Sequence, residues 1–260
     1  LPNTNSALMP VPGNHELLSK QGKTRLPNPG AEREWISWFK NQPAFKLSGN
    51  GPTPSSDAQD QLFSDQSTLS YTFDRGDVRF IVLNTDTFRK DSSGALTADI
   101  AQIPLHWTQG QLARADEDTT IKHVFVLGHR NLVDPLTTTG DSPINAQQAK
   151  SLAQAMADSR KTRAFLCAHV HAYDVTTFGR RDLFQVVAGH GGSQLESNWN
   201  PSAGPTNGFA VIRVHRSGSV DEVGYHRPVP TERAAYLSAP ATPARPDMAR
   251  FIYKPSVLRR

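Results

Sequence analysis

The sequence predicts an α/β sandwich, in which a mixed β-sheet packs between helices. Short apolar strands alternate with amphipathic helices through the middle of the 260-residue chain, and this pattern is typical of parallel strands joined by helical crossovers. Hairpin signals bracket the alternation at both ends, so antiparallel pairs should flank the parallel strands. Hydrophobic residues make up 37% of the sequence, which is enough for a large buried core.

Each element follows from a local pattern. In chain order we expect a helix at 31–40, a hairpin of strands 70–74 and 78–84, a helix at 107–116, a strand at 123–127, a helix at 145–160, strands at 164–167 and 183–188, and a second hairpin of strands 209–215 and 220–225.

The first helix is the one regular piece expected within residues 14–60, which otherwise read as a long irregular connection. Trp35, Trp38 and Phe39 recur at helical spacing, and they should pack against the protein rather than form a ligand platform. Pro43 then ends the helix.

The first hairpin combines β-branched and aromatic residues with a glycine-containing turn, Arg75-Gly76-Asp77. Its second strand carries the apolar run Phe80–Leu83, and His123–Leu127 is similar. Such runs indicate strands buried on both faces of a sheet.

The two later helices are amphipathic, because apolar residues recur along one face of each. These residues are Trp107, Leu112 and Ala115 in the first helix and Ala149, Leu152, Ala153 and Met156 in the second. The second hairpin turns at Ser217-Gly218-Ser219. Beyond it the sequence is rich in Pro and Ala, so we expect a domain over residues 1–227 and an extended tail over 228–260.

Composition excludes some functions and leaves others open. Lys and Arg number 28 against 24 acidic residues, a net charge of +4; this suits an anionic small molecule, but the charges are scattered and form no nucleic-acid stripe. No apolar run approaches the roughly 20 residues that span a bilayer. Cys167 is the only cysteine, which rules out a disulfide within the chain and indicates a small buried residue.

The histidines give the main functional signal. His129, His169 and His171 each follow a predicted strand, and side chains at the carboxyl ends of parallel strands meet at one edge of a sheet. His169 and His171 would point to the same side if the backbone were extended there. Imidazole nitrogens placed together in this way are common metal ligands.

A second signal lies in Gly13-Asn14-His15-Glu16. The side chain of Asn14 offers a neutral oxygen ligand, which suits a site with two cations. His15 would lie beside the metals, where it could hydrogen-bond a phosphate oxygen or protonate a leaving group.

Three motifs follow one another in the chain: Gly13-Asn14-His15-Glu16, Val126-x-x-His129 and His169-x-His171. In this order they resemble the last three of five motifs of the calcineurin-like metallophosphoesterases. The Glu after Asn14-His15 and the pattern Val126-x-x-His129 are most similar to the purple-acid-phosphatase-like branch. The resemblance covers about residues 10–225. It implies an α/β/β/α fold with mixed sheets between helices, and export to the periplasm or the medium.

The resemblance also implies residue roles. Asn14, His129 and His169 would be ligands of a second metal, His171 would be a ligand of a first metal, and His15 would be the outer-sphere catalytic histidine. The cofactors would be two divalent or trivalent ions, such as Fe, Zn or Mn, that share a hydroxide. The implied activity is hydrolysis of a small phosphate ester, either a monoester or a diester.

Two further residues are candidates for substrate contact. Arg130 could clamp a phosphate oxygen, and a surface salt bridge is the equal alternative. His190 lies in a glycine-rich loop and could touch substrate, although a structural or merely exposed loop histidine is the stronger interpretation. Ala168 stands where the family has Gly, which is tolerable unless its φ is positive.

The family's opening carboxylate motifs do not occur in the sequence. Gly76-Asp77 and Gly140-Asp141 sit in turn contexts, and no Asp-x-His is present. The chain also starts without Met, and its first motif follows at Gly13, so we expect an N-terminally incomplete domain. The alternative is an inactive, non-catalytic module that keeps the fold and at most one metal.

Overall fold

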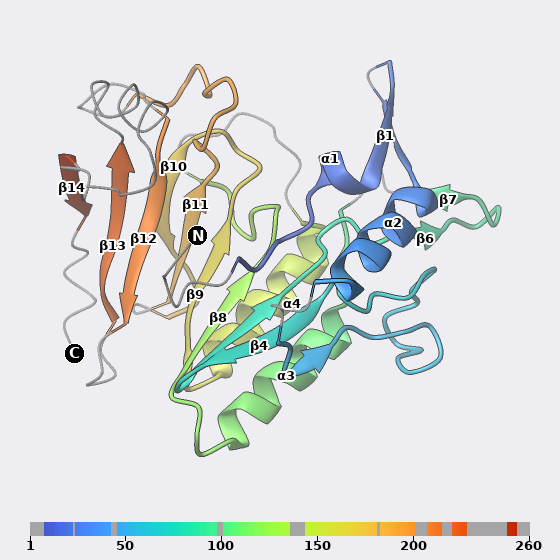
Figure 1. Cartoon of the computed structure of the whole chain (residues 1–260), viewed down its shortest axis with the longest axis horizontal. Helices are drawn as coiled ribbons and strands as arrows, with labels where there is room; N and C mark the ends of the chain where they lie inside the picture. Colours follow the sequence, from blue (N-terminus) through green and yellow to red (C-terminus); the bar gives the residue numbers. More distant parts are fainter. Residues whose placement is uncertain are drawn as a thin grey trace.

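The computed structural model describes residues 8–22, 24–42, 46–97, 101–135, 144–180, 183–200 and 207–214, and the backbone of 220–227 and 249–253. Within this part of the chain the centre is a seven-stranded mixed sheet of order β10-β11-β9-β8-β5-β4-β3 (Figure 1).

The strands of this central sheet are β3 (Gly49–Asn50), β4 (Tyr71–Arg75), β5 (Val78–Val82), β8 (His123–Leu127), β9 (Thr162–Cys167), β10 (Tyr173–Thr177) and β11 (Phe184–Ala188). The helices are α1 (Asn14–Leu17), α2 (Pro29–Lys40), α3 (Leu105–Glu117) and α4 (Ala146–Asp158). The smaller sheets contain β1 (Leu18–Gln21), β2 (Thr24–Pro27), β6 (Arg89–Lys90), β7 (Leu96–Thr97), β12 (Phe209–Val214), β13 (Val220–Arg227) and β14 (Ala249–Tyr253).

Four neighbouring strands, β5, β8, β9 and β11, run parallel. Their carboxyl ends therefore lie along one edge of the sheet, where an open α/β sheet characteristically binds ligands. The hairpin strand β4 and the edge strand β10 are antiparallel to their neighbours. The sheet is mixed, as the sequence predicted.

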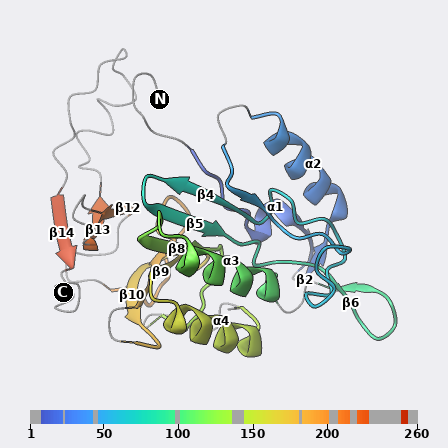
Figure 2. The same cartoon turned by 90° about the horizontal axis from the view of Figure 1, so that it is seen from below.

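The two faces of the sheet are covered differently. Helices α3 and α4 pack on one face over the main apolar cluster, which includes Ile81, Val126 and Leu152, and Figure 2 shows both helices on the same side. On the other face, Ala210 and Ile212 of β12 pack toward the sheet, and α2 covers the β4–β5 end through Phe39. The predicted α/β class, with a mixed sheet packed against helices, is confirmed.

The expected elements form close to their predicted bounds. Helix α2 begins where Asn28 Oδ1 accepts a hydrogen bond from the backbone N–H of Ala31, with Pro29 in the first turn; both residues favour a helix start. Strand β8 occupies the predicted 123–127 and is almost fully buried. Cys167 is a free, buried thiol, as predicted, and burial raises the pKa of that thiol.

The irregular connection predicted for residues 14–60 is wrong in part. It contains the short helix α1 and an antiparallel hairpin, β1–β2, in which Lys20 lies directly opposite Arg25. These strands are four residues each and mostly polar, so they show none of the apolar alternation by which strands are recognised in a sequence.

Most of the tail predicted for residues 228–260 lies outside the described residues, and Ala249–Tyr253 pair with β13 as β14. Residue 215, at the end of the predicted strand 209–215, also lies outside them. In the described part of the chain no helix combines the length and the apolar character needed to cross a bilayer.

Candidate metal and anion site

The edge formed by the strand ends carries the predicted residues. His129 and Arg130 follow β8, and His169 follows the neighbouring strand β9. Asn14 reaches the same point from α1, although it lies 115 positions before His129. We call Asn14, His129 and His169 the histidine cluster.

The three side chains of the histidine cluster are in contact. His129 Nε2 lies 3.0 Å from Asn14 Oδ1 and 3.0 Å from His169 Nδ1. The two imidazole rings meet edge to face, with centroids 4.8 Å apart and planes at 73°. The predicted convergence of these three residues is what the structure shows.

Burial keeps both imidazoles neutral. It lowers the pKa of His129 to about 4 and that of His169 to about 3. For His169 the neighbouring charge of Arg130 acts in the same direction as burial, and Arg25 contributes as well. At neutral pH each ring therefore keeps a nitrogen lone pair, the form in which histidine binds a metal.

The donor atoms fit a cation in spacing and in chemistry. Two ligands at right angles on bonds of about 2.1 Å lie roughly 3 Å apart, which matches the contacts made by His129 Nε2. That nitrogen carries at most one hydrogen and cannot donate separately to two neighbours. The described residues hold no group of three or more His, Cys, Asp or Glu arranged for a metal, and the third donor here is an amide oxygen.

The segment before α1 is shaped around His129. A Cβ at Gly13 would lie 2.9 Å from His129 Nδ1 and 2.9 Å from Glu16 Oε2. Glu16 accepts a hydrogen bond from the backbone N–H of Gly13 at 3.0 Å, in the manner of a capping box. Gly13 and Glu16 therefore both help to place the start of α1 against His129.

The His169-x-His171 segment is not extended. His169 has φ +54°, a left-handed conformation that histidine adopts more readily than most residues. The alternation that would place His169 and His171 on one side therefore does not apply. Ala168 is not among the described residues with positive φ. Alanine can therefore stand at this position, where the family has Gly, without backbone strain.

His171 lies near the histidine cluster without joining its contacts. Its Nδ1 lies 2.7 Å from the carbonyl oxygen of Gln194, to which it donates. A backbone carbonyl commonly orients a metal-binding histidine in this way and leaves Nε2 with its lone pair. Electrostatic repulsion from the side of His171 also opposes protonation of His169 and lowers the pKa of His169.

Arg130 is held by a carboxylate that the sequence analysis did not place in the site. Arg130 Nε donates to Asp86 Oδ1 at 2.8 Å, and Nη2 lies 2.7 Å from the same oxygen. Nη1 lies 3.4 Å from His169 Nε2. Both ion-pair partners are buried, so the surface salt bridge considered for Arg130 is a buried one.

His15 lies at the rim of the site beside the β1–β2 hairpin. Arg25 Nη2 is 2.9 Å from His15 Nε2. Because a guanidinium only donates hydrogen bonds, His15 Nε2 is the acceptor and carries no hydrogen in this arrangement. Nothing in the sequence marked Arg25, since the hairpin itself was not predicted.

His190 follows β11 and is completely buried. Its ring packs edge-on to Tyr173, with centroids 5.5 Å apart, and against Trp199 at 5.6 Å. The ring has a packing role in this conformation, and its contact with substrate stays a prediction.

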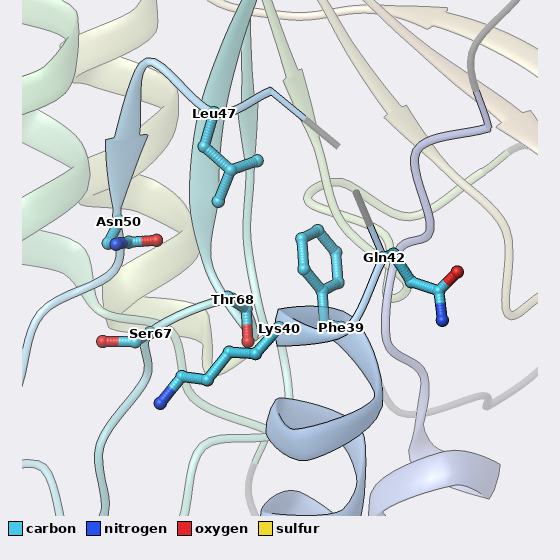
Figure 3. Close-up of a pocket in the computed structure, with 7 residues that line it drawn as sticks. All are labelled: Phe39, Lys40, Gln42, Leu47, Asn50, Ser67 and Thr68. Carbon is cyan, nitrogen blue, oxygen red and sulfur yellow. The ribbon is translucent and has the colours of Figure 1, made fainter. Parts of the chain in front are cut away.

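A pocket of about 330 Å³ lies beside the C-terminal end of α2 (Figure 3). It is lined by Phe39, Lys40, Gln42, Leu47, Asn50, Ser67 and Thr68. None of these residues belongs to the histidine cluster, and the chemistry considered above does not involve this pocket.

Asp86 could have been found from the sequence. It follows the predicted strand 78–84 just as His129 follows 123–127, so the same strand-end argument applies to it. Its loop is fixed by Asn84, whose Oδ1 accepts a hydrogen bond from the Asp86 N–H at 2.8 Å.

No protein-family model and no curated protein matches the chain. Several solved structures resemble it, and three of them are described below. GAP50, the anchor in the inner membrane complex of Plasmodium, has a TM-score of 0.41 at 14% identity over 65% of this chain and 55% of its own. A dimetal phosphatase from Danio rerio has a TM-score of 0.31 at 13% identity over 47% of this chain and 33% of its own.

PhoD has a TM-score of 0.35 at 13% identity over 65% of this chain and 36% of its own. The chain thus spans about a third to a little over half of the lengths of these proteins. Likenesses at this level assign no activity to it, and the functional argument rests on the residues of the site.

Proposed function

We propose that the protein is a metal-dependent hydrolase of phosphate esters. The observation that supports this best is the convergence of Asn14, His129 and His169 from three separate segments, with donor atoms 3.0 Å apart. Both histidines are neutral, and the N, N, O donor set suits Zn, Fe or Mn.

Each residue has a part in the proposed site. The histidine cluster would hold one cation, and His171 would be a ligand of a second. A cation held there would supply Lewis acidity toward a phosphoryl oxygen. His15 would contact the phosphoryl group from the rim, and Arg130, positioned by Asp86, would offset charge on its oxygens.

A second candidate function is a non-catalytic module that binds at most one metal. The ion pair between Asp86 and Arg130 favours this function. Asp86 is the carboxylate that lies beside the histidine cluster, and in this ion pair it does not bridge two metals. Without a bridging carboxylate, two divalent cations a few ångströms apart would repel each other strongly.

One experiment tests the ligand assignment and separates the two functions. The purified chain is equilibrated with Mn²⁺ or Zn²⁺, freed of unbound metal, and assayed for metal content and for hydrolysis of p-nitrophenyl phosphate. We expect one tightly held metal per chain, which His169→Ala loses while circular dichroism stays unchanged.

His106→Ala is the matched control, since it removes an exposed imidazole that is bound to Asp57 and not to the histidine cluster. If His169→Ala keeps the metal content of the unaltered chain, the ligand assignment is wrong. Metal-dependent turnover supports the hydrolase, and bound metal without turnover supports the non-catalytic module.

A further inference from the structure

We propose that Arg25, carried by the β1–β2 hairpin, is the residue that binds the non-bridging oxygens of the substrate's phosphate at the rim of the histidine cluster. This assignment rests on the proposed function and extends it, because it gives the hairpin a role in substrate recognition. Three observations support it.

The first observation is the position of the guanidinium group. Arg25 Nη2 lies 2.9 Å from His15 Nε2, and His15 is adjacent in sequence to Asn14. Two arginines thus approach the cluster from different elements, since Arg130 reaches His169 from the end of β8. Planar guanidinium groups are well suited to bind phosphate oxygens in pairs.

The second observation is the charge balance of the two arginines. The charge of Arg130 is offset by the buried carboxylate of Asp86. Arg25 instead faces His15 Nε2, and no carboxylate in the described part of the chain lies within ion-pair distance of Arg25. Glu16, the acidic residue nearby in sequence, points back to the N–H of Gly13. Among the described residues the charge of Arg25 is therefore not offset by a carboxylate, and it can bind an incoming anion.

The third observation is an unfavourable pair of like charges in the hairpin. Lys20 and Arg25 are direct partners in the antiparallel register, so their side chains share one face. Like charges placed directly opposite each other destabilise a strand pair. An unfavourable pair of like charges is expected where one of the two residues serves binding.

The resulting step involves no covalent change. An arriving phosphate replaces His15 Nε2 as the acceptor of the Arg25 hydrogen bond and is held between Arg25 and the cluster. Because most of β1 is exposed and each strand of the hairpin is only four residues long, the hairpin can adjust to the anion without disturbing the central sheet.

The test measures phosphate binding by calorimetry on the full chain after equilibration with Mn²⁺ or Zn²⁺. Inorganic phosphate is the first probe. Phenylphosphonate, a phosphate-ester analogue that cannot be hydrolysed, is the second. We expect Arg25→Gln to weaken binding of both probes about tenfold, and Arg25→Lys to restore part of it, since Lys keeps the charge but not the paired donors.

Arg75→Gln is the matched control. It removes the same charge from an exposed position at the end of β4, at the opposite edge of the sheet, and should leave binding unchanged. The proposal is overturned if Arg25→Gln binds either probe as well as the unaltered chain does, if only inorganic phosphate binds, or if neither probe binds.

Metal content measured on the same samples separates the two proposals. A chain that holds metal and binds both probes independently of Arg25 contradicts the role of Arg25 and leaves the hydrolase in place. A chain without metal whose phosphate binding still depends on Arg25 contradicts the hydrolase and supports the anion site.

Discussion

Gly13 lets the ring of His129 lie directly against the chain that enters α1. The space that its missing Cβ would fill is already occupied by the imidazole and by the Glu16 carboxylate. Glycine at this position is therefore explained by a contact across 116 residues of sequence and not by backbone conformation, because its φ is −120°.

We therefore expect Gly13→Ala to move His129 away from Asn14. The added Cβ meets a half-buried ring, and small displacements of metal ligands or of the groups that orient them typically cost about tenfold or more in metal affinity. Calorimetric titration with Zn²⁺ would measure the loss. Unaltered affinity would show that the ring can move aside at no cost.

Gly110→Ala is the matched control for this substitution. Gly110 lies in α3, and the nearest heavy atom to its added Cβ would be Arg114 Nη2 at 3.7 Å. Since alanine favours a helix over glycine by about 0.5–1 kcal/mol, this variant should be slightly more stable and should bind Zn²⁺ with unchanged affinity.

At the scale of single elements, α2 is unusual because its first turn buries a carboxyl group. Glu32 is 2% exposed. Ser64 Oγ donates to its Oε2 at 2.5 Å, but Oε1 has no hydrogen-bond partner among the described residues. Burial raises the pKa of Glu32 from 4.5 to about 7, so the folded protein favours the protonated carboxyl.

This shift predicts a pH dependence. Between about pH 4.5 and 7 the folded state binds the Glu32 proton more tightly than the unfolded state does, so the contribution to stability is largest at low pH and is lost as pH rises through 7. Relative to Glu32→Gln, the unaltered chain should lose roughly 3 kcal/mol over this window. Urea unfolding at pH 5 and at pH 7.5 would measure it.

A constant stability difference between the two proteins at both pH values would contradict this prediction. Comparing the proteins with each other, and not one protein with itself, cancels the titration of the other buried groups.

Elements that bury apolar side chains could be predicted from the sequence, and elements held by pairing alone could not. Strand β8 and helix α4 carry strong apolar patterns and form as expected. The β1–β2 hairpin has a mostly polar sequence, and its pairing is visible only in three dimensions.

The same distinction applies to the site. Histidines that follow predicted strands could be brought together by the geometry of parallel sheets alone, and His129 and His169 do meet. The left-handed backbone of His169 and the approach of Arg25 depend on tertiary contacts, and no pattern of residue types indicates them.

At the scale of the whole molecule, stability should be unevenly distributed. Strand β8 lies between two parallel neighbours and is covered on both faces, by α4 and α3 on one side and by β12 on the other. Within the described residues β1 and β2 form a separate two-stranded sheet, and most of β1 is exposed.

Hydrogen exchange should reveal this difference. Amides of β8 should exchange only when the whole domain unfolds, whereas those of β1 and β2 should exchange through local opening, about a hundredfold faster or more. Mass spectrometry of exchanged, digested protein would measure both segments. Equal protection of the two would mean that the hairpin is anchored to the domain by contacts not described above.

The contact between Asn14 and His129 joins two side chains that lie 115 positions apart in the sequence. A closure of that length is formed late, because its entropic cost must be met by the packing of the strands in between. A cation that requires both side chains would thus recognise the finished fold and not its precursors. At a hundred times its dissociation constant it would add about 2.7 kcal/mol to the free energy of unfolding. Metal supply would then set part of the margin by which the folded chain is favoured over the unfolded one.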